Sequence, residues 1–215
     1  MKDDKFSKLV FATSNEGKMR EIREILSDIG VEVLSLKDLN IDMNVEENGS
    51  TFEENAYIKA NEASKLTGLP ALADDSGLEV DYINKEPGIY SARYMGEDTS
   101  YDVKNKNIIE RLSKAVGDER SARFVCVISA VFPSGKILTS KGIIEGIIAK
   151  VPSGNEGFGY DPIFYIPKLA KTTAELSLEE KNRISHRGKA LNEMKENIVN
   201  YMGCAVNNEE NINRK

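Results

Sequence analysis

The first third of the chain alternates between apolar runs and apolar positions at helical spacing. The segments KLVFATS (8–14) and VEVLSL (31–36) are apolar runs whose residues favour strands. The segment between them places apolar residues along one helix face: Met19, Ile22, Ile25, Leu26 and Ile29. Gly30 follows, where a helix-terminating glycine belongs. The pattern therefore predicts a strand, a turn, a helix and a second strand.

A second helix is predicted to begin at Ser50 or Thr51. Glu53 and Glu54 follow these two residues at the spacing of a capping box, in which the side chains of both partners satisfy the first N–H groups. The helix then continues through FEENAYIKANEASKL, residues 52–66.

The rest of the chain combines short apolar runs with one hairpin pattern. The predicted elements are strands over 69–75 and 77–83, separated by Ser76 and Gly77; a helix over 101–115; a hairpin of 122–132 and 136–149; a strand over 163–166; and a helix over about 185–201. These elements predict an α/β or α+β fold with a mixed sheet. No repeat or linker divides the chain, so we expect one domain over 1–203 and a poorly ordered polar tail over 204–215.

Composition narrows the class of protein. At 215 residues, with 40% hydrophobic and 30% charged residues, the chain can bury a proper core. No run approaches the roughly 18 to 20 apolar residues that span a bilayer, and no signal peptide is visible, so we expect a cytoplasmic protein without a membrane partner. A net charge of −6 argues against a nucleic-acid partner but is compatible with a nucleotide substrate. The two cysteines form neither a disulfide framework nor a zinc motif.

The first candidate for chemistry is the turn between the first strand and the first helix. Its residues are Thr13, Ser14, Asn15, Glu16, Gly17 and Lys18. A helix N-terminus offers unpaired N–H groups to phosphate, and a lysine adds a cation. A Walker-A motif is excluded because Ala12 replaces its first glycine and Met19 its Ser/Thr. An ordinary capped turn is the structural alternative.

The second candidate is acidic. Glu46 and Glu47 lie in a predicted loop, and Asp74 and Asp75 end a predicted strand. Mg²⁺ prefers one or two carboxylates completed by water and phosphate oxygens. Because successive strand side chains point to opposite faces, Asp74 and Asp75 should not both enter one site. A solvated Asp-Asp-Ser-Gly turn is the alternative.

The third candidate is Lys59, which shares one polar helix face with Asn55 and Glu62; such faces are most often simply solvated. The fourth is the loop GNEGFGYDPIF (154–164), where Phe158 could stack on a base while free backbone groups read its edge. A partly buried loop aromatic is the alternative there.

The fifth candidate is the basic segment KNRISHRGK (181–189). Lys181 and Arg187 could hold phosphate or a base carbonyl, and His186 is the only histidine of the chain. An exposed basic helix start would explain the same residues.

The order of these segments carries a resemblance to a known family. The segments are FATSNEGKMREI, EENGSTFEENAYIKA, LADDSGLEVD, PGIYSARYMGE, GNEGFGYDPIF and SHRGKAL. Together they closely resemble the inosine triphosphate pyrophosphatase family, from about Leu9 to about Met202. The resemblance implies hydrolysis of ITP, dITP and XTP to the monophosphate and pyrophosphate with Mg²⁺. It also implies an elongated α/β fold with a mixed central sheet, two lobes with a substrate cleft between them, and a homodimer.

The resemblance assigns roles to individual residues. It implies Glu46 and Asp75 as metal ligands, Asp75 also as proton acceptor, and Thr13 through Lys18 as the triphosphate loop. The remaining implied substrate contacts are Lys59, Ser76, Phe158, Gly159, Tyr160, Asp161, Lys181, His186 and Arg187. Ser14 and Glu16 depart from many family members, which leaves the preferred substrate more open than the reaction.

Two other functions would use the same residues. A related pyrophosphatase for pyrimidine or modified nucleotides would share the carboxylates, so only a panel of substrates separates it. A nucleotide-binding sensor would need no water-activating carboxylate, and Glu46, Asp75 and Lys18 argue against it. A purely structural protein would explain none of the five segments.

Overall fold

The computed structural model describes the backbone of residues 6–212 and the side chains of residues 6–203. Seven strands are hydrogen-bonded in the order β2-β1-β3-β4-β5-β6-β7, and five α-helices accompany them. The strands are β1 (Lys8–Phe11), β2 (Glu32–Ser35), β3 (Ala71–Val80), β4 (Ser121–Val131), β5 (Ile137–Ile148), β6 (Phe164–Ile166) and β7 (Lys171–Thr172). The helices are α1 (Glu16–Ile25), α2 (Phe52–Thr67), α3 (Tyr101–Arg111), α4 (Leu178–Ile184) and α5 (His186–Ile212). The predicted α/β fold with a mixed sheet is confirmed.

The chain forms two compact units. Unit 1 comprises residues 1–75, 127–141 and 190–215, and unit 2 comprises residues 76–126 and 142–189. The strands β3, β4 and β5 each contribute residues to both units. The two-lobed domain over 1–203 and the substrate cleft stay predictions. No helix among the described residues is long and apolar enough to cross a membrane.

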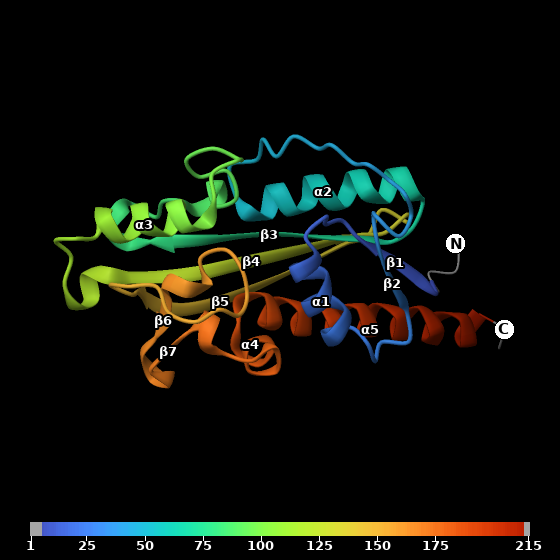
Figure 1. Ribbon diagram of the computed structural model, residues 1–215. Coiled ribbons are helices and arrows are strands. Elements are labelled where there is room, and N and C mark those ends of the chain that lie inside the picture. Colours follow the sequence, from blue (N-terminus) through green and yellow to red (C-terminus); the bar gives the residue numbers. More distant parts are fainter. Residues whose placement is uncertain (1–5, 213–215) are drawn as a thin grey trace. The chain divides into compact units, whose positions relative to one another are not determined.

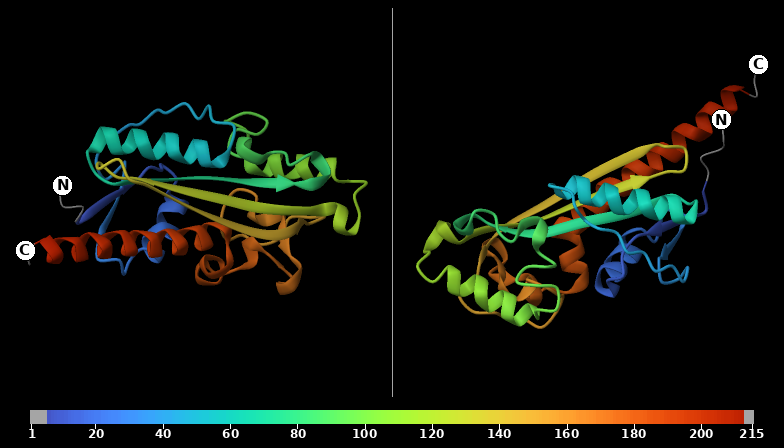
Figure 2. Two further views of the ribbon diagram at one scale, coloured as in Figure 1. Left: turned by 180° about the vertical axis from the view of Figure 1, so that it is seen from behind. Right: turned by 90° about the horizontal axis from the view of Figure 1, so that it is seen from above.

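Unit 1 is a parallel strand–helix–strand arrangement with a third parallel strand. β1 pairs with β2 through Lys8–Glu32 to Phe11–Ser35 and with β3 through Val10–Ala71. Figures 1 and 2 show α2 on one face of these strands, with α1 and α5 on the other. Alanines 60 and 63 of α2 are fully buried against the strand core, so α2 approaches the sheet closely.

Unit 2 contains the antiparallel edge of the sheet. β5 pairs with β6, and β6 with β7. Figures 1 and 2 show α3 on one side of these strands and α4 on the other. The core between them is apolar and aromatic, and Phe124 and Phe164 pack there with ring centroids 4.5 Å apart.

The structure corrects one prediction about the strands. Residues 69–75 and 77–83 do not form two strands, because β3 runs unbroken from Ala71 to Val80 through Ser76 and Gly77. Turn-forming residues are held extended here because β3 has a strand on each side, β1 and β4.

Three helix ends also differ from the predictions. α3 ends at Arg111, with Leu112 as its C-cap, before the end predicted at residue 115. α1 ends at Ile25, with Leu26 as its C-cap, before the predicted glycine stop at Gly30. α5 continues to Ile212, beyond the end predicted near Tyr201. Residues 213–215, and the side chains beyond residue 203, lie outside the described residues, so the disordered tail stays a prediction.

Candidate active site

The predicted turn after β1 is a capped helix start. The side chain of Asn15 accepts a hydrogen bond from the backbone N–H of Lys18 at 3.1 Å, and Thr13 Oγ1 accepts one from the N–H of Asn15 at 3.2 Å. The exposed Glu16 pairs with Lys37 at 3.1 Å across the surface, and Ser14 is also exposed. The turn thus presents the start of α1, with its unpaired N–H groups, beside the Lys18 side chain.

Lys18 is held by the first of two adjacent aspartates. Its Nζ lies 3.0 Å from each carboxylate oxygen of Asp74, whose side chain is 1% exposed. The Lys18 side chain keeps 20% of its surface exposed. The ammonium is therefore anchored at the sheet and still accessible.

Lys59 is held by the second aspartate and a loop glutamate. Its Nζ lies 3.6 Å from Asp75 and 3.1 Å from Glu47, and its side chain is 14% exposed. Burial alone would lower the pKa of Lys59, but the charges of Asp75, Asp74 and Glu47 outweigh it and raise that pKa. Burial raises the pKa of Asp75 above its usual range; Lys59 opposes this and Glu47 adds to it.

Asn55 joins the acidic loop to Asp75. This fully buried side chain donates from Nδ2 to Asp75 at 3.2 Å and accepts at Oδ1 from the N–H of Gly49 at 2.9 Å. A Cβ added to Gly49 would lie 2.6 Å from that Oδ1, so only glycine fits the contact. The sequence pattern placed Asn55 on a polar face with Lys59 but gave it no role.

The two aspartates contact different helices, as the alternation of strand side chains predicts, and the exclusion of Asp74 from the site of Asp75 stays a prediction. Asp74 contacts Lys18 of α1, and Asp75 contacts Asn55 and Lys59 of α2, and these helices cover opposite faces of the strands (Figure 1).

The acidic side chains fit a magnesium ion by their chemistry. Within the described residues no three acidic, histidine or cysteine side chains gather as a metal site. Mg²⁺ typically takes only one or two carboxylates together with water and phosphate oxygens, so a two-carboxylate set suffices. Asp75 provides one carboxylate. Lys59 pairs with both Asp75 and Glu47, so Glu47 also lies at this site, and the exposed Glu46 is its neighbour in the sequence. No described contact joins Glu46 to Asp75, so that predicted pair stays a prediction.

In unit 2, Asp161 fixes the glycine-rich loop. Its carboxylate accepts hydrogen bonds from the N–H of Phe158, from Thr173 Oγ1 and from Lys181 Nζ, each at 2.8 Å. Gly157 has φ +76°, and a Cβ there would lie 2.2 Å from Asp161 Oδ2. The Asp161 side chain is thus occupied by the protein, and the sequence pattern gave no signal for Thr173.

Two basic side chains lie against the ring of Phe158. Lys181 Nζ lies 4.7 Å and the guanidinium of Arg187 5.5 Å from the ring centroid. Arg187 Nη2 also lies 3.4 Å from Ser76 Oγ, which joins two of the predicted contacts. These cations, both buried, place hydrogen-bond donors at an aromatic surface.

His186 and Tyr160 are held by the protein itself. The imidazole of His186 stacks on Phe124 at 4.7 Å between centroids and an interplanar angle of 17°. The Tyr160 hydroxyl donates to the carbonyl of Ser91 at 2.8 Å, and burial raises the pKa of Tyr160. Tyr160 can therefore offer a ligand its backbone rather than its hydroxyl.

Comparison with known proteins gives a consistent result. The chain matches the Ham1 family over residues 9–197. It is 48% identical over 197 residues to a dITP/XTP pyrophosphatase of Clostridium perfringens, covering 89% of this chain and 97% of that protein. A dITP/XTP pyrophosphatase of Thermus thermophilus is 52% identical over 184 residues, covering 86% and 88%. The solved structure of a HAM1 protein from Coxiella burnetii matches with a TM-score of 0.82 at 42% identity, covering 90% of this chain and 98% of that one.

Proposed function

This chain belongs to the Ham1 family, and we propose that it hydrolyses deaminated purine nucleoside triphosphates, ITP, dITP and XTP, to the monophosphate and pyrophosphate. Two lysines, each paired with one of two adjacent strand aspartates, are the structural observation that supports this reaction most directly. They supply cations for a triphosphate and a carboxylate for a water molecule within one unit.

Lys18, Lys59 and the start of α1 are proposed to bind the triphosphate. The ammonium of Lys18 is accessible, and the first N–H groups of α1 have the orientation and positive dipole end that favour phosphate oxygens. Holding the chain of phosphates in line with an attacking water lowers the entropic part of the barrier.

Asp75 and Glu46 are proposed to hold a magnesium ion. When bound, the ion would neutralise negative charge on the phosphate oxygens. Lys59 would hold Glu47 and Asp75 in place through its ion pairs with both carboxylates, and Asn55 would hold Asp75 in one orientation.

Asp75 is also proposed to accept the proton of the attacking water. The water oxygen forms a bond to the α-phosphorus, the bond from that phosphorus to the bridging oxygen breaks, and pyrophosphate leaves with the bonding electrons. Burial raises the pKa of Asp75, which makes this carboxylate a better proton acceptor than a solvated one.

The base is proposed to be selected by unit 2. Phe158 offers a surface on which the base can stack, and Lys181 and Arg187 can donate hydrogen bonds to a 6-oxo group. The 6-amino group of ATP would place a hydrogen-bond donor against these donors. Such a mismatch can lower kcat/KM for the wrong substrate by a factor of about 10⁴ or more. We propose further that the enzyme is a homodimer and acts on the cytoplasmic nucleotide pool.

A panel of nucleotides tests this function. Pyrophosphate release would be measured from ITP, dITP, XTP, GTP, ATP and UTP, with Mg²⁺ and with EDTA. We expect metal-dependent release from the first three and little from the others. Preferential turnover of UTP would favour a pyrimidine enzyme, and binding without turnover would favour a nucleotide sensor.

A further inference from the structure

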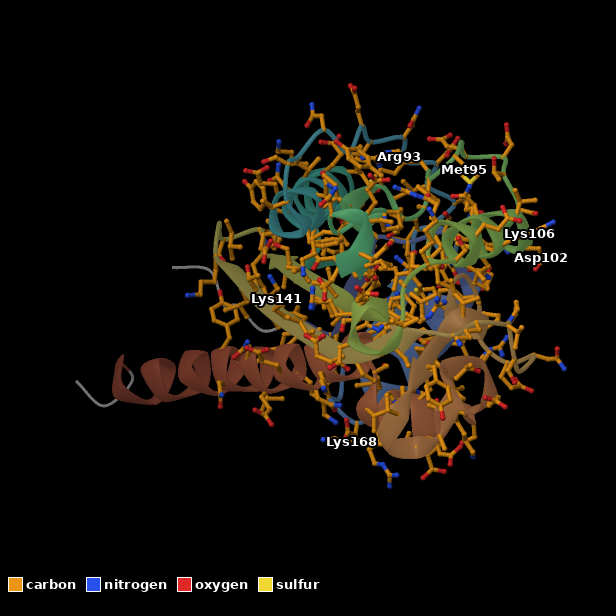
Figure 3. The ribbon with its side chains drawn as sticks, turned by 90° about the vertical axis from the view of Figure 1, so that its left-hand side faces the viewer. Arg93, Met95, Asp102, Lys106, Lys141 and Lys168 are labelled. Carbon is orange, nitrogen blue, oxygen red and sulfur yellow. The ribbon has the colours of Figure 1, made fainter. Side chains whose placement is uncertain are left out.

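The helix α3 of unit 2 has one side in solvent and one side against the protein. Asp102 and Lys106 are exposed and point outward (Figure 3). Lys104, Asn105 and Ile108 are buried on its inner side. The side chain of Asn105 reaches the glycine-rich loop, because its Nδ2 donates to the carbonyl of Gly159 at 3.1 Å.

This contact fixes the orientation of the Asn105 amide. A carbonyl oxygen only accepts hydrogen bonds, so the amide must turn Nδ2 toward Gly159 and Oδ1 away from it. Asn105 is 3% exposed, and its Oδ1 is buried with no hydrogen-bond partner within the described part of the chain. A buried acceptor without a partner is destabilising. An asparagine at this position is therefore better explained by the hydrogen bond from Nδ2 to the Gly159 carbonyl than by a gain in the stability of the fold.

Asn105 also determines where the next N–H group points. In a trans peptide the C=O and N–H bonds point in opposite directions, so a Gly159 carbonyl turned toward α3 turns the Tyr160 N–H away from it. Among the described residues, the N–H groups of Gly159 and Tyr160 have no hydrogen-bond acceptor. Gly159 has φ +71°, and Tyr101 of α3 packs edge-on against the Tyr160 ring at 5.2 Å. The loop thus presents consecutive backbone donors in a fixed orientation.

We propose that Asn105 is a positioning residue for base selection, which holds the Gly159–Tyr160 peptide so that its N–H donates to the 6-oxo group of the substrate base. This inference rests on the proposed function. Without Nδ2 the peptide can rotate and present its carbonyl instead, and a carbonyl accepts a hydrogen bond from the 6-amino group of ATP. Asn105 would therefore act on the choice between bases and not on the cleavage of the phosphate.

The test compares Asn105→Leu and Asn105→Ala with Asn107→Ala. Asn107, two residues further along α3, accepts a hydrogen bond from the Tyr94 hydroxyl at 2.8 Å and has no described contact with the loop. Initial rates of pyrophosphate release would give kcat and KM for ITP and ATP. We expect the ratio of kcat/KM for ITP to that for ATP to fall about tenfold in both Asn105 variants, mainly through a higher KM for ITP. Asn107→Ala should keep the wild-type ratio.

Binding constants separate this inference from the proposed function. If the wild-type protein cleaves none of the nucleotides, the proposed reaction is wrong, and Asn105 is tested by calorimetric titration with IMP and AMP. A fall in the preference for IMP in the Asn105 variants alone would support its role. An unchanged ratio in Asn105→Ala, or an equal fall in Asn107→Ala, would overturn it. Two sizes of replacement guard against a variant that does not fold.

Discussion

The ammonium of Lys59 lies 3.6 Å from a carboxylate oxygen of Asp75, and both side chains are largely withdrawn from solvent. A buried charged pair of this kind is costly to break, since removing one partner leaves the other uncompensated. The pair also joins α2 to the middle of β3. In the proposed reaction, Lys59 would contact the phosphates and Asp75 would accept the proton, both within unit 1.

Asp75→Asn should abolish most of the activity while preserving the fold. An asparagine keeps an oxygen that accepts from Asn55, but it cannot accept the proton of water. Loss of a general base typically costs about 10² to 10⁴ in rate. The measurement is kcat and KM for ITP at saturating Mg²⁺.

Asp74→Asn is the matched control for that prediction. Asp74 contacts Lys18 rather than Lys59, so its loss should raise the KM for ITP more than it lowers kcat. If Asp75→Asn keeps full activity, Asp75 is not the proton acceptor.

Glu46→Gln and Glu47→Gln should have different effects. Glu46 is exposed and is proposed as a metal ligand, so its loss should raise the Mg²⁺ concentration for half-maximal rate by about tenfold or more. Glu47 holds Lys59, so its loss should chiefly raise the KM for ITP. A Mg²⁺ titration of both variants decides this; if only Glu47→Gln changes the Mg²⁺ requirement, Glu47 is the ligand.

Gly157→Ala should disrupt the glycine-rich loop of residues 154–164, whereas Gly135→Ala should not. Both glycines have positive φ, so both substitutions strain the backbone. Only at Gly157 does a Cβ meet another atom, Asp161 Oδ2 at 2.2 Å, while Gly135 has nothing within 4 Å. We expect a higher KM for ITP in Gly157→Ala alone. Equal KM values in the two variants would contradict the proposed role of this loop.

Stability should depend on pH through Asp81. Hydrogen bonds from Arg123 lower the pKa of Asp81; burial opposes this, and Lys85 lowers it further. Because the folded-state pKa is depressed, the ionised pair stabilises the fold above the unfolded pKa, and this contribution is lost as pH falls through the folded pKa. The Asp81 side chain is 35% exposed, so solvent screens the pair and its contribution to stability should be at most about 1 kcal/mol.

Urea unfolding of the wild type and of Asp81→Asn tests this dependence. The variant should be less stable at neutral pH, and the difference should close as pH falls below about 4. A difference that does not change with pH would show that Asp81 acts through packing.

The sequence predicted local features of this protein better than contacts between distant residues. Helical spacing located α1, and the capping boxes located the start of α2, where Thr51 is the N-cap and Glu54 accepts from Ser50. Strand alternation predicted that Asp74 and Asp75 point to opposite faces, and they contact different helices. These predictions depend only on neighbouring residues.

The features that were missed depend on residues far apart in the chain. Asn55 lies 20 positions from Asp75, and Asn105 lies 54 positions from Gly159, so no local spacing indicates either hydrogen bond. The same reason explains the wrong break at Ser76, because the strands on both sides of β3 hold it extended. The roles of individual residues were predicted only by the resemblance to a family, because hydrophobic periodicity does not assign them.

The central claim is that water attacks the α-phosphorus and releases pyrophosphate. Its most direct test is hydrolysis of ITP in ¹⁸O-labelled water, with the masses of the separated products determined by mass spectrometry. Attack at the α-phosphorus predicts IMP that carries one ¹⁸O atom and pyrophosphate that carries none. Label in pyrophosphate, or formation of IDP and orthophosphate, would contradict the proposed reaction.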